Sequence, residues 1–174
     1  MSQSPSDRAH CHPLDQALAL TPQGANLWHG QTSAAYANMV GPFGGISAAQ
    51  AMQAVLQHPQ RLGEPVALTV NFASALEPGA LAIEARPART NRSTQHWLVE
   101  MRQGEQTVLT ATAVTALRRS TWSADEEPMP VCLPPDQVAR VDLDIPMQWV
   151  RRYEMRPIVG GMPMVWDGAG QSSL

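Results

Sequence analysis

Two adjacent glycines at the start of an expected helix are the residues in this sequence best suited to chemistry. Gly44 and Gly45 follow Gly-Pro-Phe at 41–43, and helix-compatible residues then run to about Gln57. Because neither glycine has a side chain, the first N–H groups of the helix are open to close approach. Those N–H groups and the helix dipole favour a carbonyl oxygen that is becoming negative. The alternative is that the glycines only permit a buried helix to pack.

The helix that begins at these glycines is expected to be thin and central. It contains alanine at positions 48, 49, 51 and 54, so a sheet can wrap closely around it. His58-Pro59 is expected to end it, because a proline disfavours helix in the residue before it. The spacing predicts one apolar stripe and a separate polar face. The predicted stripe is Ala48, Ala49, Met52, Val55 and Leu56, and the predicted polar face is Gln50, Gln53 and Gln57.

Alternating sequences on both sides of the helix predict antiparallel strands. Residues 17–21 and 26–31 are expected to form a hairpin before the helix, and a meander of three or four long strands is expected after it. Pro87 is expected to interrupt or bulge one strand. Asn71 and Thr69 share the polar face of the first meander strand, which we expect near the helix. The apolar positions of the later strands are Val66, Leu68, Val70 and Phe72; Leu81, Ile83 and Ala85; Trp97, Val99 and Met101; and several residues between Thr107 and Leu117.

The boundaries of these patterns divide the chain into four parts. Residues 1–12 are expected to be a disordered tail, and 13–119 to form one α+β domain around the helix. Residues 120–146 are rich in proline and lack a steady period, which is typical of a semi-rigid linker. Residues 147–156 alternate again, so we expect a strand there. With 157–174 it is interpreted as the incomplete start of a second domain.

Composition excludes several classes of protein. The chain has 174 residues and a formal net charge of −3, with its basic residues mostly scattered, so no nucleic-acid interface is expected. Cys11 and Cys132 match no metal or redox spacing, which favours a reducing compartment, and we expect a cytoplasmic protein with no metal and no cofactor. No apolar run is long enough to span a bilayer, so no membrane partner is expected.

One helix wrapped by an antiparallel sheet, opened by Gly-Pro-Phe-Gly-Gly at 41–45, resembles the hotdog fold. More closely, the chain resembles the N-terminal half of double-hotdog acyl-CoA thioesterases of the thioesterase II type, in the thioesterase-like superfamily. The resemblance covers residues 13–156. It is carried in order by the motif at 41–45, Leu-Thr-Val-Asn-Phe at 68–72, residues 89–97, Glu-Met-Arg-Gln-Gly at 100–104 and residues 153–156, which resemble the start of the second hotdog.

The resemblance implies a set of site residues. The Gly45 N–H is expected to stabilise the oxyanion, with Phe43 and Gly44 beside the substrate. Asn71 is expected to contact substrate or orient water, or to be an ordinary strand position. Trp28 and Trp97 either line an acyl tunnel or lie in the core. The hairpin that crosses the site in the family supplies the remaining candidates, Ser93, Thr94 and Gln95 near the thioester and Arg89 and Arg92 near the phosphates of coenzyme A, although each also suits an ordinary turn or strand.

The resemblance stops before the family's catalytic acid. In the family, an Asp at the second helix and the Thr and Gln that complete the site belong to the C-terminal half, which is absent here. We therefore expect an acyl-CoA thioesterase that forms a homodimer in imitation of the double hotdog. The alternative is a non-catalytic acyl-CoA-binding or dimerisation module left by truncation. The acyl chain length and the identity of the base cannot be predicted from the sequence.

Overall fold

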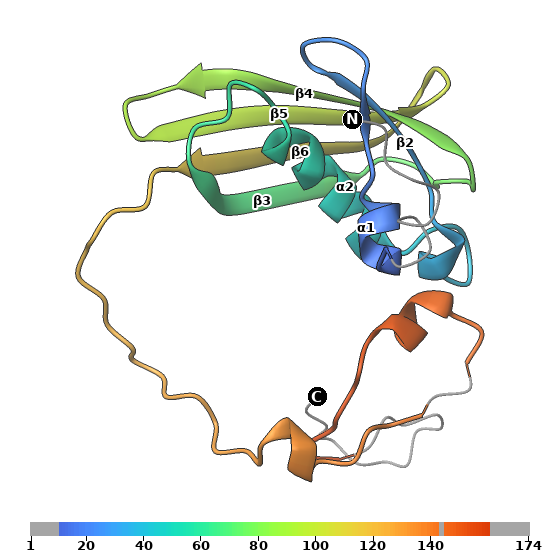
Figure 1. Ribbon diagram of the computed structural model, residues 1–174, viewed down its shortest axis with the longest axis vertical. Helices are drawn as coiled ribbons and strands as arrows, with labels where there is room; N and C mark the ends of the chain where they lie inside the picture. Colours follow the sequence, from blue (N-terminus) through green and yellow to red (C-terminus); the bar gives the residue numbers. More distant parts are fainter. Residues whose placement is uncertain (1–10, 143–144, 161–174) are drawn as a thin grey trace.

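A computed structural model describes residues 11–142 and 145–160 of the chain. One long helix lies against an antiparallel sheet of six strands (Figure 1). This arrangement confirms the predicted α+β hotdog fold. In chain order the elements are α1 (Pro13–Ala17), β1 (Thr21–Pro22), β2 (Leu27–Gln31), the 3-10 helix η2 (Ala34–Tyr36), α2 (Gly44–Leu56), β3 (Glu64–Phe72), β4 (Ala80–Thr90), β5 (Thr94–Gln103), β6 (Gln106–Ala116), and the 3-10 helices η3 (Pro135–Gln137) and η4 (Gln148–Arg152).

The helix α2 begins and ends where the sequence predicted. Gly41 makes the turn into it with a φ of 70°, a left-handed conformation that favours glycine. A Cβ at Gly41 would also strike the backbone oxygen of Leu76. At the other end, Gln57 is the C-cap residue of α2, and Pro59 follows two positions later.

The sheet has the strand order β1-β2-β4-β5-β6-β3. Hairpins connect β4, β5 and β6 as a meander, and the register shift between Pro87 and Arg89 confirms the predicted interruption. The strand β3 pairs with β6 and not with β4, so it does not begin the meander as the sequence suggested. As a result β3 is an edge strand, and its Val66 and Phe72 side chains are 63% and 59% exposed.

The main core lies between the sheet and α2. Every second residue of the central strands points to the helix, as the alternation predicted. Trp28 and Trp97 are both buried in this core, so neither lines an open tunnel. The core side chains are Leu81, Ile83 and Ala85 from β4, Trp97, Val99 and Met101 from β5, Leu109, Ala111 and Ala113 from β6, and Ala51, Ala54 and Val55 from α2.

The buried face of α2 is not the one that the sequence predicted. Of the predicted stripe only Val55 is buried, whereas Ala48, Ala49, Met52 and Leu56 are half-buried. The buried face instead contains Gln50, which is 1% exposed. Its amide nitrogen donates to the backbone oxygens of Ala17 and Gln31, both at 2.8 Å. Two satisfied hydrogen bonds remove most of the cost of burying this polar group, so a glutamine replaces an apolar side chain there.

The segment before β2 also differs from prediction. Residues 17–21 were expected to be a strand, but the chain forms the short helix α1 and only β1 pairs with β2. Pro13 occupies the first turn of α1, and the Nδ1 atom of His12 accepts a hydrogen bond from Leu14 N at 3.1 Å. A proline at this position and a capping side chain both favour a helix start.

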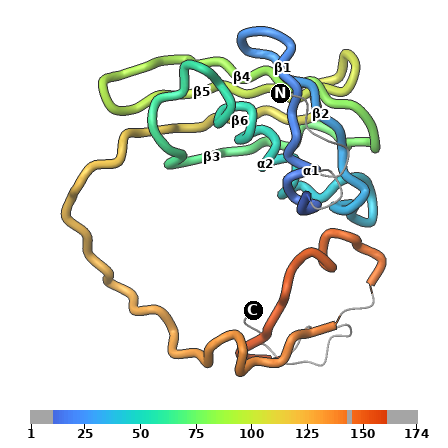
Figure 2. Tube along the Cα trace, in the orientation of Figure 1, coloured from blue at the N-terminus to red at the C-terminus, as the bar shows by residue number. Residues whose placement is uncertain are grey.

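The chain after β6 first leaves the domain and then returns to it (Figure 2). No helix or strand forms between Leu117 and Pro134, and η3 lies within the residues 120–146 that were predicted to be a linker. The strand predicted over 147–156 is wrong, because η4 forms there and lies against η2. Residues 161–174, predicted to continue a second hotdog, and residues 1–10 of the predicted tail lie outside the described residues. Across the described ranges, no helix is both long and apolar enough to cross a membrane.

Candidate functional site

The start of α2 presents two N–H groups without acceptors. Phe43 is the N-cap residue and makes no side-chain capping bond. Its carbonyl accepts from Ile46 N at 3.1 Å and Ser47 N at 3.5 Å. Within residues 11–142 and 145–160, neither Gly44 N nor Gly45 N has an acceptor. The two donors at the positive end of the helix dipole are therefore open for an oxyanion.

Two aromatic rings explain why both positions are glycine. A Cβ at Gly45 would lie 2.7 Å from Phe43 Cζ, and a Cβ at Gly44 would lie 3.0 Å from Phe72 Cζ. Packing therefore also favours a small residue at both positions, and this geometry is compatible with both the packing and the chemical explanation. Gly45 is exposed, so its N–H remains accessible beside the Phe43 ring.

The opposite end of α2 is closed by a buried histidine. His58 packs between Trp28 and Trp97, with ring centroids 5.7 and 4.9 Å away. Its Nε2 lies 2.9 Å from Asn26 Oδ1, and its Nδ1 accepts from Gln60 N at 3.1 Å. These partners fit the neutral ring with the proton on Nε2. Burial lowers the pKa of His58, which also favours the neutral form.

Gln95, predicted to contact substrate, holds the chain that follows α2. It is 1% exposed. Its side-chain oxygen accepts from Leu62 N at 2.7 Å, and its nitrogen donates to Gln60 O at 3.1 Å and to Thr90 Oγ1 at 2.8 Å. Both amide N–H groups therefore have protein acceptors, and Gln95 is a structural residue in this chain.

The other hairpin candidates lie far from Gly44 and Gly45. Thr94 pairs with Ala116, and Ala116 pairs with Glu64, which places the hairpin at the Glu64 end of β3. Phe72, at the other end of β3, is the residue that touches Gly44. Strand geometry separates these ends by about 26 Å. One copy of the chain therefore does not bring Arg89, Arg92, Ser93 and Thr94 together with the glycine amides.

Asn71 lies on the wrong face of the sheet for its predicted role. It pairs with Thr110, whereas the helix-facing residues of β6 are the neighbouring Leu109 and Ala111. Successive side chains of a strand point to opposite faces, so Asn71 and Thr69 face away from α2. The alternation separated the polar face of β3 from the apolar face, and the apolar residues Leu68 and Val70 are the ones that pack on the core beside α2.

Glu100 is on the same outer face and is unsuited to act as a base. It accepts from Arg102 Nε at 2.7 Å and from Thr107 Oγ1 at 2.6 Å. These two hydrogen bonds lower the pKa of Glu100 to about 2. A carboxylate with so low a pKa takes up a proton weakly near neutral pH. Within the described residues, no group of three or more His, Cys, Asp or Glu side chains is placed to hold a metal.

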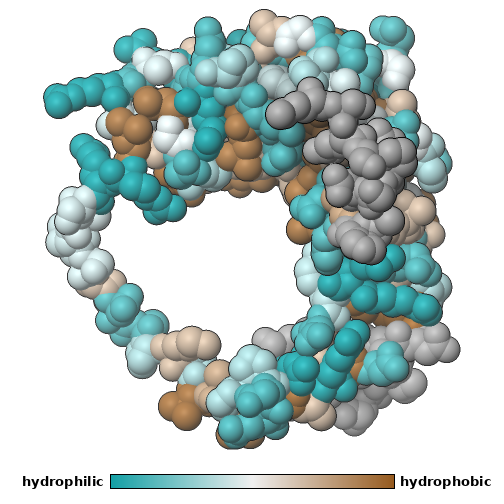
Figure 3. All heavy atoms as spheres, viewed as in Figure 1, coloured by the Kyte–Doolittle hydropathy of each residue, from teal (hydrophilic) through white to brown (hydrophobic). Residues whose placement is uncertain are grey.

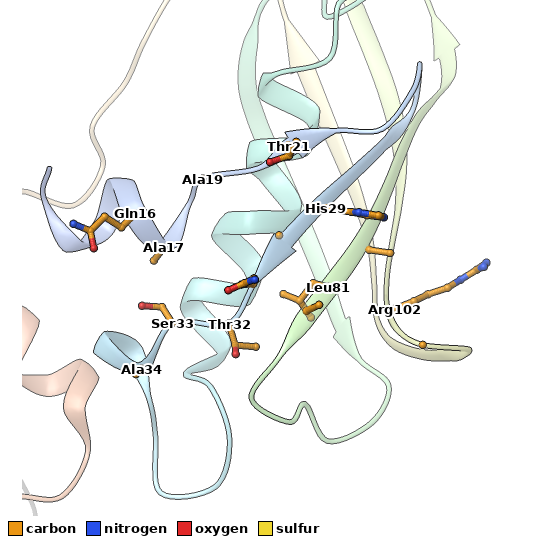
Figure 4. Close-up of a pocket in the computed structure, with 15 residues that line it drawn as sticks. Gln16, Ala17, Ala19, Thr21, His29, Thr32, Ser33, Ala34, Leu81 and Arg102 are labelled. Atoms are coloured by element: carbon orange, nitrogen blue, oxygen red, sulfur yellow. The ribbon is translucent and has the colours of Figure 1, made fainter. Parts of the chain in front are cut away.

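A hollow of about 760 Å³ lies elsewhere (Figure 4). Its walls come from the α1–β1 segment, from β2 with the residues up to Ala34, and from Ala80 to Ala82. His29 and Arg102 lie on one side of it, both paired in register with Ala82. None of the predicted site residues lines this hollow, and it shares no residue with the start of α2.

Trp149, in η4, packs beside the start of α2, and sequence reasoning missed this contact. Its ring stacks on Phe43 with centroids 4.3 Å apart and an interplanar angle of 9°. Trp149 was noted only as part of an expected strand, and its hydrogen-bond partner Asn38 is 111 positions away in sequence. No local pattern predicts a contact at that separation.

Comparison with known families and structures gives a consistent result. Residues 33–116 match a family model described as the acyl-CoA thioesterase N-terminal domain. No curated protein matches the chain.

Three of the similar solved structures are longer proteins. A conserved protein of unknown function with a hot dog fold from Alicyclobacillus acidocaldarius is 48% identical, with a TM-score of 0.83, over 87% of this chain and 57% of that one. A proposed thioesterase II from Thermobifida fusca is 21% identical, with a TM-score of 0.73, over 83% and 54%. An acyl-CoA thioesterase II, TesB2, from Mycobacterium marinum is 16% identical, with a TM-score of 0.66, over 87% and 56%. The chain therefore spans somewhat more than half the length of these proteins.

Proposed function

We propose that this chain, whose residues 33–116 match the acyl-CoA thioesterase N-terminal domain, binds an acyl-CoA and takes part in hydrolysing its thioester. The observation that carries the proposal is the pair of open N–H groups at Gly44 and Gly45. They lie at the uncapped start of α2, within the matched residues.

In the proposed reaction the substrate carbonyl oxygen accepts from these two N–H groups. A water molecule attacks the carbonyl carbon, and negative charge develops on the oxygen where the donors and the helix dipole stabilise it. The carbon–sulfur bond then breaks, and coenzyme A leaves as a thiolate while the carboxylic acid is released. The proton of the attacking water passes to a base.

The base is not on α2. From Gly44 to Leu56 the helix contains no Asp, Glu or His. Glu100 and Asn71 face away from α2, on the other side of the sheet. In the proposal, a second hotdog domain supplies the base, either as another copy of this chain or as part of a longer protein.

A second copy has a suitable place to pair. β3 is a long edge strand with exposed apolar side chains, and Figure 3 shows apolar surface on the side of the domain that carries α2 and β3. Antiparallel pairing of two β3 edges would bring the Glu64 end of one copy beside the Phe72 end of the other. The hairpin with Arg89, Arg92, Ser93 and Thr94 would then lie near the partner's glycine amides. This geometry supports a dimer, in which arginines reach the phosphates of coenzyme A.

The absence of a base on α2 also supports a second candidate, a non-catalytic acyl-CoA-binding or dimerisation module. Such a module needs the open amides and the edge strand but no proton acceptor. The expected compartment is the cytoplasm, which agrees with the unpaired state of Cys11 and Cys132.

The test is release of free thiol from a panel of acyl-CoAs by this chain, with its mass and oligomeric state measured in the same preparation. Gly45→Val should lower the rate at least about 100-fold, because the new side chain displaces Phe43 and blocks the N–H. Gln53→Val places the same side chain further along α2 and should keep the rate.

Each outcome separates the candidates. Thiol release that falls only in Gly45→Val supports hydrolysis. Acyl-CoA binding without release at any chain length supports the binding module. Equal release by both variants and the wild type would remove the glycine amides from the mechanism.

A further inference from the structure

We propose that Trp149 is a positioning residue for the site, which holds the Phe43 ring beside the Gly45 amide and so determines which acyl groups reach it. This inference rests on the proposed acyl-CoA function. It adds a residue from outside the matched residues 33–116.

The indole of Trp149 is fixed from several directions. Its ring stacks on Phe43 at 4.3 Å. Its backbone N–H donates to Ala37 O at 3.2 Å, and its Nε1–H donates to Asn38 Oδ1 at 3.3 Å. An aromatic stack with two hydrogen bonds restricts both the position and the rotation of the ring.

The rest of η4 secures this contact. Val150 is buried, and Arg152 Nε donates to Ala35 O at 3.3 Å. The ring of Tyr153 meets Trp149 edge to face, with centroids 5.8 Å apart. Trp149 also packs on a small core separate from the main one, which consists of Ala17, Tyr36 and Ile46. The contact therefore involves a whole segment and not one exposed side chain.

Phe43 transmits this contact to the amides. It is the N-cap residue of α2, and its ring occupies the space that a side chain at Gly45 would fill. An acyl group whose carbonyl oxygen reaches Gly45 N would therefore lie beside the Phe43 ring. With Trp149 in place the ring forms a rigid apolar wall. Without Trp149 it can change rotamer and leave a wider, less selective approach.

The first test does not depend on activity. The amide proton of Gly45 lies close to the Phe43 ring, so its NMR chemical shift reports the position of that ring. Trp149→Ala should move the Gly45 resonance. Trp149→Phe should leave this resonance close to its wild-type chemical shift, because a stacked ring remains. Trp122→Ala is the matched control, since Trp122 is 84% exposed in the linker. An unchanged Gly45 resonance in folded Trp149→Ala would overturn the proposal.

The second test measures KM and kcat across acyl chain lengths. Trp149→Ala should flatten the chain-length preference by about fivefold or more, mainly through KM, and Trp149→Phe should restore it. A uniform loss of kcat at all chain lengths would point to a merely structural role and would overturn the proposal. If the wild type hydrolyses no acyl-CoA, the proposed catalysis fails, and the same comparison made with acyl-CoA dissociation constants decides the inference.

Discussion

The two ends of α2 differ in how their polar groups are satisfied. At the C-terminal end, His58 is 4% exposed and both ring nitrogens have partners. Gln95 holds the following loop with two hydrogen bonds and donates a third to Thr90 in β4. At the N-terminal end, Gly44 N and Gly45 N have no acceptor within the described residues, and Gly45 is exposed. The same helix therefore has one saturated end and one open end.

This difference separates a structural role from a chemical one. Buried polar groups in native proteins are almost always paired, so the closed end needs no function beyond stability to explain it. Under the proposed function, the two N–H groups without acceptors at the start of α2 bind the substrate oxygen. We therefore expect substitutions at the closed end to reduce the free energy of unfolding, and substitutions at the open end to reduce activity or binding. The following predictions test this, from the largest expected effect on stability to the smallest.

Trp97→Ala should cost about 3–5 kcal/mol of unfolding free energy, because it leaves a large cavity in the core and removes the hydrogen bond from Trp97 Nε1 to Thr115 Oγ1. Phe43→Ala, at the half-buried open end, should cost only about 1 kcal/mol. Urea denaturation measures both. Similar losses for the two variants would contradict the proposed difference between the ends.

His58→Ala should cost about 2–3 kcal/mol at pH 7.5, because Asn26 and Gln60 lose their partner and a small cavity forms. The wild type should also become less stable with acid. Since burial lowers the pKa of folded His58 below 6.5, the unfolded chain binds the proton more readily once the pH falls below 6.5. Lowering the pH from 7.5 to 5 should lower the urea midpoint of the wild type, and should lower that of His58→Ala by less. An equal pH dependence in both would exclude His58 as its source.

Gln95→Ala should cost about 1–2 kcal/mol, because it leaves the N–H of the half-buried Leu62 without its acceptor. Thiol release per folded molecule should stay close to the wild-type value. A large rise in KM with normal stability would instead restore Gln95 as a substrate residue, as first predicted.

Arg92→Ala should change stability by less than about 0.5 kcal/mol, since Arg92 is exposed and has no hydrogen-bond or ion-pair partner within the described residues. It should weaken coenzyme A binding several-fold at low salt, and the difference should shrink as salt is added. Arg86→Ala, on the outer sheet face, is the control. Equal weakening in both variants would indicate a general charge effect.

Much of the fold could be predicted, because it depends on patterns of residues that are close in sequence. Pro59 and the glycines defined the limits of α2, and the alternation in 80–116 identified the residues of β4, β5 and β6 that face the core. The open amides at Gly44 and Gly45 were also found, since an uncapped helix start depends on a few consecutive residues.

The errors arose where a pattern depends on distant partners. The alanines of α2 lie on several of its sides, so apolar periodicity barely distinguished the faces of the helix. Long-range hydrogen bonds placed Gln50 on the buried face. The alternation in β3 could not show that this strand would pair with β6 at the edge of the sheet and not with β4. The contact of Trp149 with Phe43 joins segments separated by a long linker, and single-sequence reasoning has no means to detect it.

That linker also determines how strong the Trp149 contact has to be. Because residues 117–147 connect η4 covalently to the domain, η4 meets its docking surface at a local concentration on the order of millimolar. A contact with only millimolar intrinsic affinity therefore suffices to keep η4 docked about half of the time. A separate peptide of residues 145–156, added at micromolar concentration, would scarcely compete with it. The proline-rich tether thus lowers the intrinsic affinity that the Trp149 contact needs in order to be populated.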